Sequence, residues 1–157
     1  MLTNEIKIIL KKENNKKNLI ITIGNSFRHD DGVGPYIYLN LNKLPYDYLI
    51  LNAGNNPENI IDTAISINPD KTIFIDAANF NGAPGEIKLI SEDLISAFTL
   101  STHIFPLNII SKMIEKETGS NIFFIGIQCK NLNFGEGLSN EIKKSADKII
   151  NYIKSLN

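Results

Sequence analysis

Acidic and imidazole side chains follow three apolar stretches of this sequence. Asp30 and Asp31 lie in the segment GNSFRHDDGVGP, Asp76 closes the run TIFID, and His103 stands in the segment STHIFP. Two carboxylates and a neutral imidazole supply oxygen and nitrogen donors, which suit zinc, nickel or a related divalent ion. If the three segments meet in space, they form a partial metal site with coordination positions left open.

Each of these residues also has a structural explanation. Asp30 or Asp31 would cap a helix that starts just after them. Asp76 ends a buried run, where the loss of hydration requires a hydrogen-bond donor or a metal as its partner. A lone histidine such as His103 is more often structural than a ligand, so the residue types alone leave both interpretations open.

Other catalytic patterns fit the sequence less well. The single cysteine, Cys129, follows a predicted strand end, and a buried structural thiol explains it better than a nucleophile. The sequence has neither the Gly-x-Ser-x-Gly elbow of serine hydrolases nor the His-Glu-x-x-His pair of zinc proteases. The run Gly32-Val33-Gly34 lacks the third glycine of a dinucleotide-binding loop.

The elements that must position these residues alternate along the chain. Apolar, β-branched runs predict strands at 19–23, 48–51, 72–75, 87–90 and 122–127. Helical spacing predicts helices within 4–13, from Pro35, from Pro57, from Pro106 to Gly119, and over 139–156. This order predicts an α/β fold, a three-layer α/β/α sandwich around a mainly parallel, roughly five-stranded twisted sheet.

Two features refine this architecture. The segment 79–90 has an NGAPG turn and no preceding helix, which predicts an antiparallel or peripheral strand. In open α/β sheets, ligands bind at the carboxyl ends of the strands. The three polar segments are therefore expected to lie together at the carboxyl edge of the sheet.

Composition narrows the function classes. The 157 residues fit a single domain over 1–157, with 1–17 as a peripheral N-terminal extension. A formal net charge of -1 argues against a nucleic-acid partner. One cysteine, no apolar run of membrane-spanning length and no secretory signal together predict a cytoplasmic protein without a membrane span.

Five ordered motifs from about Leu19 onward resemble those of the hydrogenase maturation endopeptidase family. They are Gly24-Asn25-x-x-Arg28-x-Asp30-Asp31-Gly32-Val33-Gly34-Pro35, Ala53-Gly54-Asn55-Asn56-Pro57-Glu58-Asn59, Asp76-Ala77-x-x-Phe80 with Pro84-Gly85-Glu86, Ser101-Thr102-His103-x-x-Pro106-Leu107, and Gly126-Ile127-Gln128 with Leu138-Ser139. The resemblance implies the same sandwich fold. It also implies a peptide-bond hydrolase, of the aspartyl type, that activates a NiFe hydrogenase by removing the C-terminal extension of its large-subunit precursor.

The resemblance also assigns the site. By motif position, Asp31, Asp76 and His103 become the metal-binding and catalytic triad. The implied metal is nickel already held by the precursor, so the resting protease needs no metal or other cofactor of its own, although zinc or cadmium can occupy such a site. The expected partner is this precursor, and the expected protease is a monomer.

The resemblance also leads to expectations for four further residues. Asp30 is expected either to orient the loop or to form hydrogen bonds within it. His29 stands where relatives often have glycine and either narrows the loop or adds an imidazole near the metal. Asn79 replaces a common second aspartate, which puts an acid–base role there in doubt, and Cys129 replaces a common proline.

Two alternatives remain. A chaperone or checkpoint module would bind the same nickel-bearing precursor without cutting it, and catalytic turnover separates it from a protease. In the second alternative, the chain is an α/β domain without such a site, and the aspartates at the strand ends only cap helices. The side chains of Asn25, Asn55 and Asn59 fit either contacts with a substrate backbone or ordinary turns and caps.

Overall fold

A single twisted sheet forms the centre of the protein, whose computed structural model describes residues 1–43, 48–100 and 106–156. The strand order is β2-β1-β3-β5-β4. Four strands are parallel, and the fifth runs antiparallel to β5 at one edge. They span Asn18–Ile23 (β1), Tyr48–Gly54 (β2), Lys71–Ala78 (β3), Ile87–Ile90 (β4) and Asn121–Gln128 (β5). The predicted mainly parallel sheet is confirmed, as is the antiparallel, peripheral strand at 87–90.

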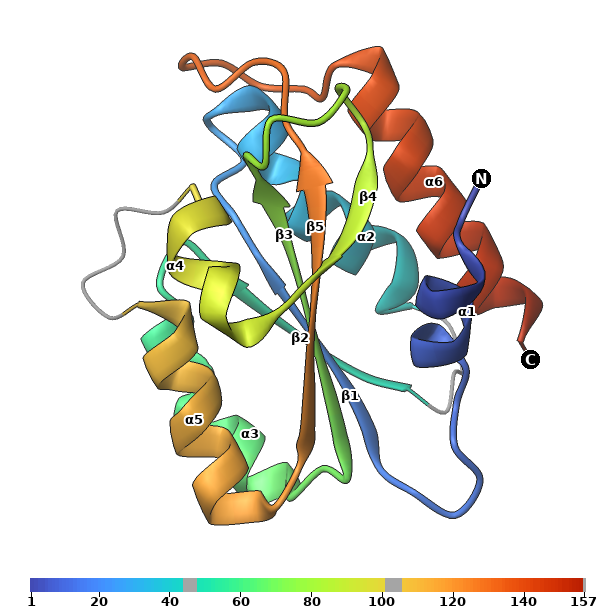
Figure 1. Cartoon of the computed structure of the whole chain (residues 1–157), viewed down its shortest axis with the longest axis vertical. Helices are drawn as coiled ribbons and strands as arrows, with labels where there is room; N and C mark the ends of the chain where they lie inside the picture. Colours follow the sequence, from blue (N-terminus) through green and yellow to red (C-terminus); the bar gives the residue numbers. More distant parts are fainter. Residues whose placement is uncertain (44–47, 101–105, 157) are drawn as a thin grey trace.

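Helices cover both faces of this sheet (Figure 1). One layer contains α1 (Asn4–Leu10), α2 (Val33–Leu41) and α6 (Asn140–Ser155), and the other contains α3 (Ile61–Ile67), α4 (Ile95–Phe98) and α5 (Leu107–Thr118). The alternation of side chains along β1 divides the core between the layers, because Ile20 packs with the first and Leu19 with the second. All six β1 residues are buried, as predicted for a strand covered on both faces. The predicted three-layer sandwich is confirmed.

Helix boundaries follow the residues that predicted them. Pro106 is the N-cap of α5, and Gly119, at φ 71°, ends it in the left-handed region. A helical segment begins at Pro57 as predicted, with the 3₁₀ helix η2 (Pro57–Ile60) leading directly into α3. Sequence patterns missed the other short pieces of the fold, namely the 3₁₀ helices η1 (His29–Gly32) and η3 (Glu92–Leu94) together with α4.

The N-terminal helix α1 is fixed to the sheet by polar contacts. Thr3 caps it, and Ile6, Ile9 and Leu10 are buried. The Lys71 ammonium, buried at the start of β3, donates to the carbonyls of Ile9 at 2.9 Å and Lys11 at 2.6 Å. A cation therefore lies beside the carbonyl groups at the C-terminal end of α1, where the helix dipole favours positive charge.

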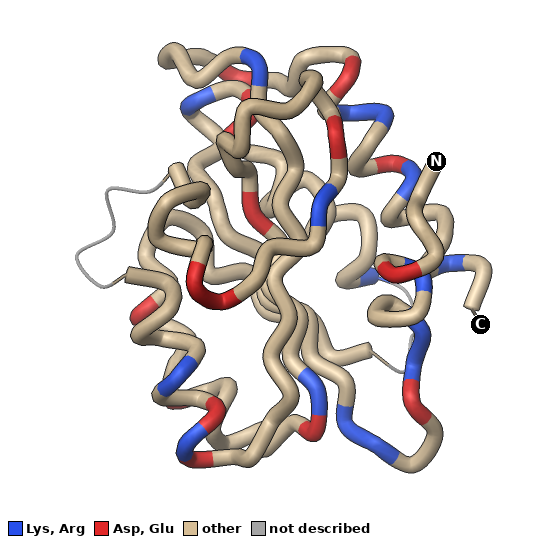
Figure 2. Tube along the Cα trace, in the orientation of Figure 1, with Lys and Arg blue, Asp and Glu red and all other residues tan. Residues whose placement is uncertain are grey.

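Charged residues are distributed over the whole molecule. Figure 2 shows lysine and arginine interspersed with aspartate and glutamate rather than gathered on one face. Within the described ranges, every helix is too short or too polar to cross a lipid bilayer.

Candidate active site

The loop after β1 carries Asp31 and lies directly over the end of the strand. Two glycines allow this close approach. A Cβ on Gly24, whose φ is 143°, would lie 1.8 Å from the Asp31 carbonyl oxygen, and a Cβ on Gly34 would lie 2.1 Å from the Ile23 carbonyl oxygen. Only glycine therefore lets η1 and the start of α2 pack against β1, and this packing places Asp31 at the carboxyl edge of the sheet.

Asp31 is partly exposed, and its position is fixed by its own loop. The Asn25 amide donates to Asp31 Oδ2 at 3.2 Å. The N-cap of α2 is Gly32, and neither aspartate occupies that position.

Asp76 lies near the end of β3, on the strand next to β1. Its register partner on β5 is Gly126. The residue is 5% exposed. It lines a small gap together with Phe74, Thr99 and Leu107, on the side of the sheet that α4 and α5 cover. The Asp76 carboxylate therefore lies in largely apolar surroundings.

Asp31 and Asp76 form an interacting carboxylate pair. The pKa of Asp76 is raised well above its ordinary value, first by burial and then by the negative charge of Asp31, while the Ala77 amide partly opposes the shift. The two carboxylates expected at the strand ends therefore lie near enough for their charges to interact. A cation between them would replace the proton that Asp76 favours, so the pair fits a metal ion.

The third predicted residue, His103, lies outside the described residues. Its segment is flanked by Thr99 and Leu107, which both line the gap beside Asp76. In the part of the chain that is described, no group of three or more His, Cys, Asp or Glu side chains could hold a metal ion. The described site is therefore the carboxylate pair alone.

Asp30 has a different role from its neighbour. Fully buried, it accepts four hydrogen bonds from the loop after β5. Oδ2 accepts from the amides of Lys130 at 2.9 Å and Asn131 at 2.7 Å and from the Ser139 hydroxyl at 2.9 Å, and Oδ1 accepts from the Ser139 amide at 2.7 Å. Asp30 hydrogen-bonds as expected, although its partners lie about a hundred residues away rather than in its own loop, and it does not cap a helix.

His29 turns its imidazole toward this same loop. Its Nδ1 lies 3.0 Å from the Gly137 carbonyl oxygen, and its backbone has a φ of 43°. This φ lies in the left-handed region, which favours glycine over other residues. The ring lines an open pocket with Tyr36, Leu39 and Leu138, at the junction of α2 and α6.

Gln128 is a structural residue that the motif comparison did not single out for a role. Its buried side-chain oxygen accepts from the amides of Phe80 at 2.9 Å and Gly82 at 3.1 Å, and its nitrogen donates to Asn79 Oδ1 at 3.1 Å. Gln128 therefore shapes the turn that follows β3. Two signals could have identified it, namely its position at the end of a buried strand and its place in the fifth motif.

Cys129 follows Gln128 and is half-buried. Burial raises the pKa of its thiol, and the charge of Asp30 raises it further. The thiolate required of a nucleophile is therefore disfavoured, which supports the structural interpretation of this cysteine.

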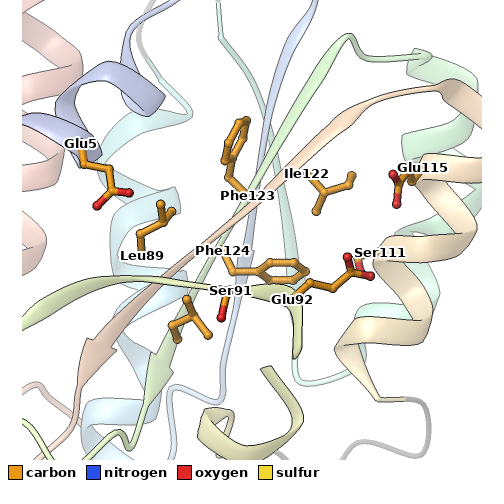
Figure 3. Close-up of a pocket in the computed structure, with 10 residues that line it drawn as sticks. Glu5, Leu89, Ser91, Glu92, Ser111, Glu115, Ile122, Phe123 and Phe124 are labelled. Atoms are coloured by element: carbon orange, nitrogen blue, oxygen red, sulfur yellow. The ribbon is translucent and has the colours of Figure 1, made fainter. Parts of the chain in front are cut away.

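A separate cavity of about 300 Å³ lies away from the strand ends, between α1 and α5 (Figure 3). Its lining includes Phe123 and Phe124 of β5 and the carboxylates Glu5, Glu92 and Glu115. Lys112 lies 3.6 Å from Glu92. Neither Asp31 nor Asp76 borders this cavity.

The chain resembles proteins of known family over most of its length. A family model described as "Hydrogenase maturation protease" matches residues 38–156. A Methanocaldococcus jannaschii protein assigned to the hydrogenase maturation proteases is 37% identical over 154 residues, covering 90% of this chain and 88% of its own. The hydrogenase 3 maturation protease of Escherichia coli K12 is 28% identical over 134 residues, covering 84% and 85%.

Solved structures agree with this assignment. The crystal structure of the NiFe hydrogenase maturation protease HycI from Thermococcus kodakarensis matches with a TM-score of 0.82 at 31% identity, covering 98% of each chain. The solution structure of the endopeptidase HycI from Escherichia coli matches with a TM-score of 0.80 at 26% identity, covering 88% of this chain and 90% of that one. The chain therefore belongs to the hydrogenase maturation proteases, a family of endopeptidases.

Proposed function

We propose that this protein removes the C-terminal extension from the large-subunit precursor of a NiFe hydrogenase after nickel insertion, and that it recognises the bound nickel through Asp31, Asp76 and His103. Family membership supports the reaction class. The observation that carries the nickel step is the paired Asp31 and Asp76, because burial and mutual repulsion disfavour two negative charges there without a cation.

The donor set suits nickel held by a substrate. Two carboxylates and an imidazole provide three ligands, which leaves positions for ligands that the precursor already supplies. Nickel in such a site supplies a positive charge that can polarise a peptide carbonyl or activate water. Within this chain, burial and the charge of Asp31 favour the protonated form of the Asp76 carboxyl, Asp31 would supply the second carboxylate, and apolar side chains surround Asp76.

Proton release should accompany nickel recognition. Because the free Asp76 carboxyl favours its protonated form, engagement of nickel displaces that proton. The apparent affinity for nickel-loaded precursor is therefore expected to rise with pH until Asp76 of the free protease is ionised.

The experiment incubates catalytic amounts of the protein with nickel-loaded and nickel-free precursor and follows loss of the extension by mass spectrometry. We expect one cleavage, in the loaded precursor only, that is lost in His103→Ala. Tight binding to loaded precursor without turnover would instead identify a checkpoint module. Equal cleavage of both forms would refute nickel recognition while leaving the protease activity in place.

A further inference from the structure

The loop between β5 and α6 holds an exposed aromatic side chain in a fixed backbone. Phe134 is 87% exposed. The Gly135 amide donates to the Phe27 carbonyl, and the His29 amide donates to the Gly135 carbonyl, both at 2.9 Å. On the other side of Phe134, Arg28 Nε donates to the Leu132 carbonyl at 3.3 Å.

This anchoring has a consequence for binding. An exposed phenylalanine on a mobile loop would lose conformational freedom when it contacts a partner, whereas the backbone at Phe134 is already held on both sides. Aromatic side chains that are fixed in advance supply large contact areas at low entropic cost. A single exposed phenylalanine is unremarkable by itself, so the surroundings of Phe134 decide its role.

Phe134 borders an open groove of about 410 Å³ at the carboxyl edge of the sheet. The groove is lined by Asn25, Arg28, Asn55, Leu132, Asn133 and Phe134. It adjoins the carboxylate pair, because the same Asn25 that lines it donates its amide to Asp31. The groove therefore leads to the proposed site of cleavage.

The chemistry of the groove walls matches a polypeptide in an extended conformation. The three asparagines offer amide groups of the kind that pair with a peptide backbone. Arg28 is the only cation among the lining residues. The Nε of Arg28 donates to the Leu132 carbonyl, and among the described residues it is the only guanidinium nitrogen of Arg28 with a hydrogen-bond partner. The other two nitrogens are able to bind a carboxylate.

We propose that this groove binds the C-terminal extension of the precursor, with a carboxylate of the extension on Arg28 and an apolar side chain on Phe134. The inference rests on the proposed function and names the surface that selects the substrate. A free chain end is the part of a folded precursor that can lie extended along an open groove beside the carboxylate pair. Phe134 and Arg28 are then specificity-determining residues, and neither takes part in the chemistry.

The test measures binding of a synthetic peptide, with the sequence of the C-terminal extension, to the nickel-free protein by calorimetry. Phe134→Ala is expected to weaken binding about tenfold or more, whereas Ile8→Ala is expected to leave it unchanged. Ile8 is the matched control because it is 72% exposed and lies on α1, away from the groove. Arg28→Gln is expected to remove the preference for this peptide over a version whose carboxylates are converted to amides.

A second readout uses cleavage of the nickel-loaded precursor. Phe134→Ala is expected to raise KM about tenfold with little change in kcat, since it removes binding energy that the ground and transition states share. Failure of the wild-type protein to bind the peptide, or an unchanged KM in Phe134→Ala, would overturn the inference. Peptide binding that depends on Phe134 without cleavage of any precursor would instead contradict the proposed function and leave the groove assignment standing.

Discussion

Asp76→Asn is expected to reduce cleavage of nickel-loaded precursor by about 100-fold or more and, at neutral pH, to make the metal-free protein more stable. Activity falls because an amide replaces the charged ligand at the reacting centre. Stability rises because the substitution keeps the shape of the side chain and removes a buried group whose ionised form is disfavoured by burial and by Asp31. An effect of about 1 to 3 kcal/mol is typical of poorly satisfied buried polar groups, and about 2 to 4 °C in Tm accompanies each kcal/mol in a chain of this size.

The pH dependence of this effect has a definite sign. An unfolded aspartate ionises near pH 3.9, and the pKa of folded Asp76 is higher. Between these two values the folded state binds more protons, so the wild-type protein loses stability as pH rises. The advantage of Asp76→Asn should therefore be absent below about pH 4 and grow until pH exceeds the folded pKa.

Thermal unfolding from acidic to neutral pH measures this difference. Asp93→Asn is the control, since Asp93 is exposed in η3 and its substitution should change Tm little at any pH. If Asp76→Asn were less stable than the wild-type protein throughout the range, Asp76 would be a structural aspartate whose hydrogen bonds are satisfied. The ionised form of Asp76 would then not be disfavoured, and the carboxylate pair would give no support to a cation site.

Asp30→Asn is expected to be the most destabilising of the conservative substitutions near the site, lowering the free energy of unfolding by about 2 to 5 kcal/mol. The carboxylate of Asp30 accepts bonds at both oxygens. An asparagine has one oxygen, so its amide nitrogen must face at least one donor of the opposite loop. Cleavage should fall as well, because η1 and the adjacent Asp31 lose their anchor.

Urea unfolding and hydrogen exchange measure these two consequences. Ser139→Ala is the matched control, since it removes one hydroxyl bond to Asp30 and keeps the backbone bond, with an expected loss of about 1 kcal/mol. In Asp30→Asn the amides of Lys130, Asn131 and Ser139 should exchange faster than in the wild-type protein. Wild-type stability together with unchanged protection of these three amides would show that Asp30 does not anchor the loop.

Local patterns were sufficient to predict most of the fold. The isoleucine-rich runs became buried strands because β-branched side chains fit a sheet that is covered on both faces. Pro106 and Gly119 marked the ends of α5 because their backbone preferences decide helix boundaries. The 3₁₀ helices η1 and η3 and the helix α4 were missed because they are too short to show a helical period.

The site was predictable to the extent that it depends on strand ends. Asp31 and Asp76 lie at the same edge of the sheet because parallel strands bring their carboxyl ends there, and that rule needs no three-dimensional detail. The partners of Asp30 and Gln128 were not predictable, because contacts about a hundred and about fifty residues away leave no local pattern. The position of His103 stays a prediction, since its segment lies outside the described residues.

Binding of the protease to a precursor whose scissile bond has been blocked by substitution tests the role of the carboxylate pair most directly. The dissociation constant would be measured for nickel-loaded and nickel-free precursor, with the wild-type protein and with Asp31→Asn and Asp76→Asn. If the pair binds the precursor's nickel, the wild-type protein will prefer the loaded form by about tenfold or more, and each variant will bind both forms alike. An unchanged preference in both variants would contradict nickel recognition by these two carboxylates.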